Sequence, residues 1–325
     1  MKPLRVGFIG AGRRALSAHY PCVNRLEGVS IEAVADLDVE RLKQVTEKYH
    51  VPHTFHCTEP KGYLKMLESV ELDAVYVIMQ PQQVVEPAVE PAVECMNAGK
   101  HIFIEKPAGR SVADSRALLE AAIANNVFCM VGFQRRFGTT TVEAMRRVKA
   151  HGPITSAMGE FHKGDGINKD LEDRFWFDAS HVVDLVRFML GSDAAEVTAY
   201  QDADGTGRRN NFNGLIRFAN RAVGIVTACR TSGGRCLRGE LHGLGISCYM
   251  DIPDKLEIHE TGSKPVVLTG AELTGVDAGD VDAYEGVLAM HRHFADCVRS
   301  GEVPNADIRD VIHTSILCER LCEPA

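Results

Sequence analysis

The sequence predicts an α/β protein with two parts. Apolar strands alternate with helical segments in the first third of the chain, which is typical of a doubly wound parallel sheet of the Rossmann type. Longer alternating runs follow from Ile154 onward, separated by short turns such as 219–221. We therefore expect residues 1–124 to form a dinucleotide-binding domain. Residues 125–325 should form a substrate-binding and oligomerisation α+β domain with a large, mostly antiparallel open sheet.

The parallel sheet of the first part is predicted from the regular spacing of strands and helices. Segments with helical spacing, such as 39–49 and 115–126, lie between apolar runs rich in β-formers. A strand that is followed by a helix and then another strand indicates parallel pairing with right-handed crossovers. The expected strands are 4–9, 29–35, 73–79, 101–104 and 127–131.

The second part shows the period-two alternation of a sheet that is buried on one face. Its expected strands include AAEVTAY, FNGLIRF, AVGIVTACR, CLRGELHG, GISCYMD, KLEIHE and PVVLT. Two helical segments, 283–301 and 307–321, close the chain. No internal repeat or low-complexity tract is present.

Composition excludes several classes of function. The 325 residues are 45% hydrophobic and 25% charged, which is ordinary for a globular protein. The formal net charge is −8 and the basic residues are scattered, so we expect no nucleic-acid partner. No apolar run approaches the ~18 residues that a membrane span needs, and no secretory leader precedes the first strand, so we expect a cytoplasmic protein. Ten cysteines without a C-x-x-C pair suit reduced thiols.

One histidine-rich segment, HVPHTFHC at 50–57, is either a structural zinc site or a polar loop. It carries His50, His53, His56 and Cys57, which are residue types that bind zinc. It also contains a proline and lies between an expected helix and an expected strand. A polar loop is favoured over a structural zinc, and we expect no metal.

The first chemical motif is a glycine-rich turn after the first strand. Residues 10–15 read GAGRRA, which fits G-x-G-x-x-G/A, and a helical segment follows. Gly10 and Gly12 permit a tight turn and close approach of a pyrophosphate, and the small Ala15 lets helix and strand pack. Asp36 ends the second strand, 21 residues after Ala15, where a carboxylate can bind the adenosine ribose. Together these features predict a dinucleotide site.

The identity of the dinucleotide follows from the residues around Asp36. Leu37 and Asp38 come next, and neither offers a positive charge for a 2′-phosphate. We therefore expect NAD rather than NADP. Arg13 and Arg14, just past the second glycine, also belong to the expected cofactor site, and either could turn toward such a phosphate.

The second motif is the charged end of the strand HIFI, where Glu105, Lys106 and Pro107 follow directly. In an open α/β sheet the carboxyl ends of the strands face the ligand crevice. An ammonium there can hydrogen-bond a substrate hydroxyl, and a positive nicotinamide nearby would lower its pKa toward acid-base use. Lys106 is thus a catalytic candidate, and Glu105 is expected to orient or neutralise it. Both residues are also assigned to the cofactor site. The alternative is a structural ion pair.

These motifs resemble the Gfo/Idh/MocA oxidoreductases along the whole chain. The resemblance rests on residues 10–15, Asp36, DAVYVIMQP at 73–81, AGKHIFIEKP at 98–107, GFQRRF at 132–137 and ASHVVDLVRFMLG at 179–191. It implies NAD(P)-linked oxidation or reduction of a sugar, polyol or related hydroxyl compound. It also implies a homodimer or homotetramer formed through the C-terminal sheet.

The resemblance also implies roles for single residues. Lys106 matches the family's EKP lysine, which touches the reacting hydroxyl, and His181 matches the usual proton carrier. Asp184 matches the last acid of the D-x-x-x-H-x-x-D signature and is expected to bind substrate. Arg135 matches a substrate-holding arginine that could equally brace a domain seam. Independently of the family, His181 and Asp184 lie three apart on an expected helix and share a face.

This chain departs from the family pattern at three places. Phe177 stands where the signature acid is expected, and Asp178 is the nearest acid before His181. Asp178 is predicted to be catalytic, with a helix N-cap as the alternative. Gln80 and Pro81, assigned to the cofactor, replace the common T-P, and Val85 replaces a frequent histidine. In the segment 161–177, where relatives bind substrate, the polar candidates are His162, Lys163 and Asp165.

The expected function is an NAD-dependent dehydrogenase or reductase of a carbohydrate-like small molecule, with Lys106 and His181 as the acid-base pair. Two alternatives stay open at this point. One is a redox-neutral NAD-dependent glycoside hydrolase or lyase, and the other is a non-catalytic dinucleotide sensor on the same fold. The sequence does not name the substrate, its stereochemistry or the favoured direction.

Overall fold

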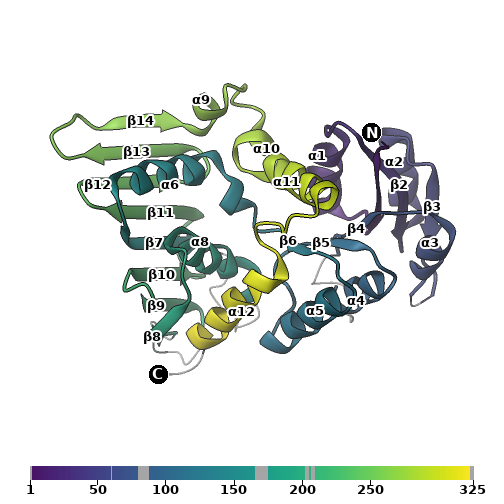
Figure 1. Cartoon of the computed structure of the whole chain (residues 1–325), viewed down its shortest axis with the longest axis horizontal. Helices are drawn as coiled ribbons and strands as arrows, with labels where there is room; N and C mark the ends of the chain where they lie inside the picture. Colours follow the sequence, from purple (N-terminus) through teal and green to yellow (C-terminus); the bar gives the residue numbers. More distant parts are fainter. Residues whose placement is uncertain are drawn as a thin grey trace. The chain divides into compact units, whose positions relative to one another are not determined.

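The computed structural model describes residues 2–59, 61–79, 88–164, 175–201, 205 and 209–322 (Figure 1). The chain divides into two compact units. The first comprises Met1–Gly132 together with Val287–Ile312, and the second comprises Phe133–Gly286 together with His313–Ala325.

The first unit is built on a six-stranded parallel sheet with the order β3-β2-β1-β4-β5-β6. This is the strand order of a doubly wound dinucleotide-binding fold, so the predicted doubly wound parallel sheet is confirmed. Its strands β1, β4 and β5 are almost fully buried, as expected for a parallel sheet with both faces covered. The strands are β1 (Leu4–Ile9), β2 (Val29–Asp36), β3 (His53–His56), β4 (Ala74–Val77), β5 (His101–Ile104) and β6 (Cys129–Val131).

The helices of this unit begin and end where local chemistry dictates. Asp38 caps α2 by accepting hydrogen bonds from the backbone N–H groups of Glu40 and Arg41, and His50 ends α2 in the left-handed region. The helical elements are η1 (Ala15–His19), α1 (Tyr20–Asn24), α2 (Val39–Tyr49), α3 (Leu64–Ser69), α4 (Val89–Asn97), α5 (Val112–Ala124) and α11 (Val287–Ser300). The last helix, α12 (Ile308–Cys322), begins in this unit and continues into the second.

The histidine-rich segment differs from the polar loop that we expected. Residues His53–His56 form β3, the edge strand that pairs in parallel with β2. His53 and His56 are exposed, which suits an edge strand whose outer side carries polar groups. Within the described residues no group of three or more His, Cys, Asp or Glu side chains is arranged to hold a metal ion.

The second unit contains an eight-stranded sheet with the order β14-β13-β12-β11-β7-β10-β9-β8. All of its neighbouring strands are antiparallel except β7 and β10, which are parallel, so the expected large and mostly antiparallel sheet is confirmed. The strands are β7 (Ile154–His162), β8 (Ala194–Tyr200), β9 (Asn211–Phe218), β10 (Val223–Cys229), β11 (Cys236–Gly243), β12 (Ile246–Asp251), β13 (Lys255–Glu260) and β14 (Val266–Thr269).

Helices cover one face of this sheet. The helix α8 (Ser180–Leu190) packs on β7, β10 and β11, and α6 (Thr139–His151) packs on β11, β12 and β13 (Figure 1). Two strand glycines let α8 approach closely, since a Cβ at Gly159 or Gly224 would come within 3.0 or 2.8 Å of a methyl of Val186. The shorter elements are η2 (Gln134–Phe137), η3 (Phe175–Ala179), α9 (Gly270–Thr274) and α10 (Val281–Tyr284).

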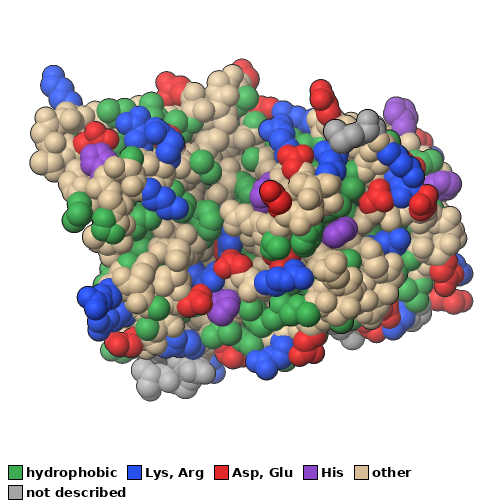
Figure 2. All heavy atoms as spheres, viewed as in Figure 1, with side chains coloured by type: hydrophobic (Ala, Val, Ile, Leu, Met, Phe, Trp, Pro, Cys, Tyr) green, Lys and Arg blue, Asp and Glu red, His purple; other side chains and the backbone are tan. Residues whose placement is uncertain are grey.

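The charged side chains on the surface are mixed in sign, as the scattered basic residues of the sequence led us to expect. Figure 2 shows Lys and Arg side chains interspersed with Asp and Glu on the visible face, without a broad region of one sign. All ten cysteines carry free thiols, most of them buried. Among the described helices, none is both long and apolar enough to cross a membrane.

Candidate active site

The glycine-rich turn joins the end of β1 to the helical segment that starts at η1. Gly10 has φ +107°, and a Cβ there would lie 2.2 Å from the carbonyl oxygen of Ile78, so only glycine fits this close approach. Asp36, at the end of β2, accepts hydrogen bonds from the backbone N–H groups of Ala11 at 2.5 Å and Asp38 at 2.8 Å. The structure therefore brings the predicted ribose-binding acid against the glycine-rich turn, as a dinucleotide requires.

The two arginines of this motif have different surroundings. Arg13 is exposed, whereas the Nε of Arg14 donates to Oε1 of Glu105 at 3.0 Å. Ala15 is fully buried and begins η1, consistent with the need for a small third residue. Arg14 is thus held toward the end of β5, whereas Arg13 is exposed to solvent.

Glu105 is the centre of a largely buried cluster in the first unit. Its carboxylate also lies 2.8 Å from Nε2 of His19, and its Oε2 accepts the backbone N–H of Lys106 at 3.0 Å. Burial alone would raise the pKa of Glu105, but the hydrogen bond from His19 and the charge of Arg14 hold that pKa well below its usual range. The carboxylate is therefore ionised at neutral pH, and it fixes the backbone at the start of Lys106.

Lys106 directly follows β5, at the carboxyl end of the sheet where the glycine-rich turn also lies. Its side chain is partly exposed. The expected cofactor residues Gln80 and Pro81 lie outside the described residues, as do Val85 and Asp165.

In the second unit, His181 lies in the first turn of α8 and is 8% exposed. Its ring meets the ring of Phe133 edge-on at 6.3 Å between centroids and is tilted against Phe161 at 6.2 Å. Because its helix packs on β7, the imidazole is held among apolar side chains near one end of that strand.

Asp178 does not occupy the N-cap position of α8, which is Ala179. Asp178 instead belongs to the π-helical turn η3. Its carboxylate accepts from Nζ of Lys163 at 2.9 Å and pairs with Nη1 of Arg230 at 2.6 Å. Since Arg230 is 1% exposed, the carboxylate compensates a buried positive charge three residues before His181.

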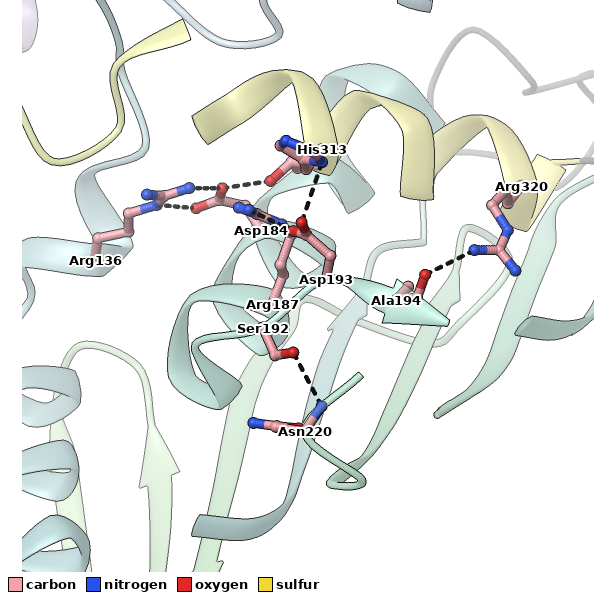
Figure 3. Close-up of polar contacts among 10 residues, drawn as sticks. Arg136, Asp184, Arg187, Ser192, Asp193, Ala194, Asn220, His313 and Arg320 are labelled. Carbon is pink, nitrogen blue, oxygen red and sulfur yellow. Dashed lines mark hydrogen bonds and ion pairs between the residues drawn. The ribbon is translucent and has the colours of Figure 1, made fainter. Parts of the chain in front are cut away.

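Asp184 is 1% exposed and lies in a buried polar network (Figure 3). Both of its oxygens accept from Arg136, at 2.8 Å from Nε and 2.5 Å from Nη2, and Oδ1 also accepts from the hydroxyl of Thr314 at 2.9 Å. This bidentate pairing joins η2 to α8 and α12. Figure 3 shows Arg136 and Asp184 pointing toward each other.

Two other expected substrate residues are also engaged within the second unit. Nη1 of the buried Arg135 donates to Glu285 at 3.2 Å. Nδ1 of His162 accepts the backbone N–H of Cys229 at 3.0 Å, which ties the end of β7 to β10.

Sequence reasoning missed four residues of these networks. Arg136 adjoins Arg135 in GFQRRF and could have been noticed as a second candidate. Nothing in the sequence marks His19, His291 or Arg230, because each acquires its role from a partner that is distant along the chain. His291 contacts Nδ1 of His19 through its Nε2 at 3.0 Å.

Comparison with known families places the chain. The oxidoreductase family model with an NAD-binding Rossmann fold matches residues 4–133, and the GFO/IDH/MocA C-terminal domain matches residues 144–245. The chain belongs to the GFO/IDH/MocA family. It is accordingly an enzyme of the oxidoreductase class, and NAD is the cofactor that its Rossmann unit is built to bind.

The relatives include two curated dehydrogenases. A 4-carboxy-2-hydroxymuconate-6-semialdehyde dehydrogenase from Sphingobium sp. is 25% identical over 95% of this chain and 95% of its own length. A scyllo-inositol 2-dehydrogenase (NAD(+)) from Bacillus subtilis is 26% identical over 93% of this chain and 88% of its own. Among solved structures, a dehydrogenase from Chromobacterium violaceum has a TM-score of 0.86 and 18% identity, covering 99% of this chain and 95% of that one.

Proposed function

We propose that this protein is an NAD-dependent dehydrogenase or reductase that acts on the hydroxyl or keto carbon of a sugar, polyol or related small molecule. The observation that carries the proposal is the cluster at the end of β5. There Glu105 fixes the backbone of Lys106 in the same unit as the glycine-rich turn and Asp36. The family membership and the inositol dehydrogenase relative support the substrate class.

The chain's own residues would divide the work as follows. Gly10, Gly12 and Asp36 would hold NAD, which when bound supplies the acceptor for the hydride that leaves the substrate carbon. Lys106 would hydrogen-bond the reacting hydroxyl through its ammonium group, and His181 would take the hydroxyl proton on its imidazole. In the reductive direction His181 would return that proton to the oxygen.

The polar residues of the second unit are proposed to bind and orient the substrate. Arg135, His162 and Lys163 can donate hydrogen bonds to hydroxyl or carboxyl oxygens. Asp178 would set the position of Lys163, and it adjoins the turn that carries His181. Asp184 would act through Arg136 rather than by touching substrate, because both of its oxygens are already occupied in a buried pair.

A substrate panel tests this function directly. Sugars, polyols and sugar acids are screened with NAD and with NADP, and both NADH absorbance and product identity are recorded. The proposal predicts NADH accumulation in proportion to an oxidised product. Product formation without NADH accumulation would instead indicate the redox-neutral hydrolase or lyase, and NAD binding without any product would indicate a sensor.

We also propose that the chain forms a homodimer or homotetramer through the open face of the eight-stranded sheet. Helices α6 and α8 cover the other face, while the open face carries exposed apolar side chains. Leu215 is 56% exposed, Ile225 43% and Tyr249 39%. Leu215 and Ile225 pair directly across β9 and β10, and exposed apolar side chains grouped on one sheet face are typical of an interface. An Ile225→Glu variant is expected to sediment as a smaller species than the wild type, and unchanged sedimentation would contradict the proposal.

A further inference from the structure

Three side chains from distant parts of the sequence form a hydrogen-bonded chain inside the first unit. Nε2 of His291 lies 3.0 Å from Nδ1 of His19, and Nε2 of His19 lies 2.8 Å from Oε1 of Glu105. Both histidines are fully buried, and Glu105 is 13% exposed. His291 comes from α11, His19 from the π-helical turn η1, and Glu105 from the end of β5.

The direction of the chain follows from counting protons. Within the described structure, Nδ1 of His291 is buried without a hydrogen-bond partner. A proton on that atom would be an unsatisfied buried donor, which is costly, whereas a bare lone pair there costs less. The proton of a neutral His291 therefore sits on Nε2 and is donated to His19. His19 in turn carries its proton on Nε2 and donates it to the Glu105 carboxylate.

The surroundings hold this arrangement rigidly. His291 is tilted against Phe103 at 4.8 Å and against Tyr76 at 5.4 Å between ring centroids, and Phe103 also meets His19 edge-on at 5.7 Å. Burial holds the pKa of His291 well below its usual range, so the imidazole stays neutral at physiological pH. The hydrogen bond to His19 sets the tautomer of the neutral His291 ring, and the aromatic contacts restrict the orientation of that ring.

We propose that His19 and His291 are positioning residues for Lys106, acting through Glu105. The second oxygen of Glu105 accepts the backbone N–H of Lys106, so any rotation of the carboxylate moves the point from which the lysine side chain projects. The chain of donors fixes that rotation. This role rests on the proposed function of Lys106 as the residue that contacts the reacting hydroxyl.

Two substitutions at one position separate positioning from packing. His291→Gln keeps an N–H donor near the place of Nε2, whereas His291→Phe keeps the aromatic packing and removes the donor. Positioning predicts that His291→Phe lowers kcat roughly tenfold while the Kd for NAD changes less than about threefold, and that His291→Gln stays within about threefold of wild type. The reverse order, with an active phenylalanine variant and an impaired glutamine variant, would overturn the inference.

A spectroscopic measurement needs neither substrate nor turnover. Nitrogen-15 imidazole spectra of the wild-type protein, assigned with the His291→Phe and His19→Phe variants, should show His291 neutral, and both rings protonated on Nε2, from about pH 6 to 8. A proton on Nδ1 of His291, or a charged His291 in this range, would overturn the hydrogen-bonded chain. A Lys106→Ala enzyme with normal turnover would instead refute the proposed function. That result would leave the spectra unaffected, so the two failures can be told apart.

Discussion

Replacing Asp184 by alanine should lower the unfolding free energy of the second unit strongly. The expected effect is a loss of stability and not a loss of substrate contacts. The substitution removes the bidentate carboxylate partner of Arg136, whose side chain is 2% exposed, so a buried guanidinium loses the negative charge that it binds through two hydrogen bonds. Breaking a buried ion pair from one side typically costs ~3–5 kcal/mol of unfolding free energy. The hydroxyl of Thr314 loses its acceptor as well, so we expect a value at the upper end of that range.

The single tryptophan offers a clean assay for this loss. Trp176 is buried in η3, directly before α8, so its fluorescence during urea unfolding reports on the second unit. The double variant Arg136→Met with Asp184→Leu serves as the matched control, because it removes both charges and should be destabilised much less than Asp184→Ala. If Asp184→Ala shifted the unfolding free energy by less than ~1 kcal/mol while raising KM, Asp184 would be a substrate ligand and the structural reasoning would be refuted.

Four further outcomes are expected. Lys106→Ala should lower kcat by ~10²- to 10⁴-fold with NAD affinity nearly intact, and activity within a fewfold of wild type would make Lys106 structural. Asp178→Asn should lower kcat at least roughly tenfold, whereas normal turnover with earlier melting would assign that carboxylate to folding alone. Fluorescence titration should show tighter binding of NAD than of NADP, and the opposite order would refute the reading of Asp36. His291 has a folded-state pKa below the unfolded value of 6.5, so below about pH 6.5 the unfolded chain binds a proton that the folded chain does not. The free energy of unfolding should therefore fall with decreasing pH, by up to ~1.4 kcal/mol per pH unit from this residue. The His291→Phe variant should lack that part of the slope. Equal slopes in the two proteins would contradict the prediction, because His19, Glu105 and Arg14, the groups whose charges act on the His291 ring, are present in both.

The elements that the sequence predicted well are those whose signal is local. Apolar runs with β-formers became β1, β2, β4, β5 and β6, and the two closing helical segments became α11 and α12. The helix of His181 was also predicted, because its apolar periodicity is visible within eleven residues. The glycine-rich turn and Asp36 were readable for the same reason, since a tight turn and a strand end are encoded by adjacent residues.

What the sequence could not supply depends on distant partners. His53–His56 reads as a polar loop because three of its four residues are polar, yet pairing with β2 makes it an edge strand. The resemblance assigns Asp184 to the substrate, whereas its pairing with Arg136, 48 residues away, is visible only in the structure. Likewise, the segment 287–312 counts with the first unit although the second unit precedes it in the chain.

The role of the opposite charges at the end of β5 depends on contacts with residues that are distant along the chain. A carboxylate beside a catalytic lysine would at first be taken for its ion-pair partner, but Glu105 binds Arg14, His19 and the backbone of Lys106 at once. Arg14 belongs to the turn that should hold the pyrophosphate, and Lys106 to the point where chemistry is proposed. One largely buried carboxylate therefore contacts both the turn proposed to hold the pyrophosphate and the backbone of the lysine proposed to act on the substrate. Cofactor binding and acid-base chemistry would thus depend on the same side chain, Glu105.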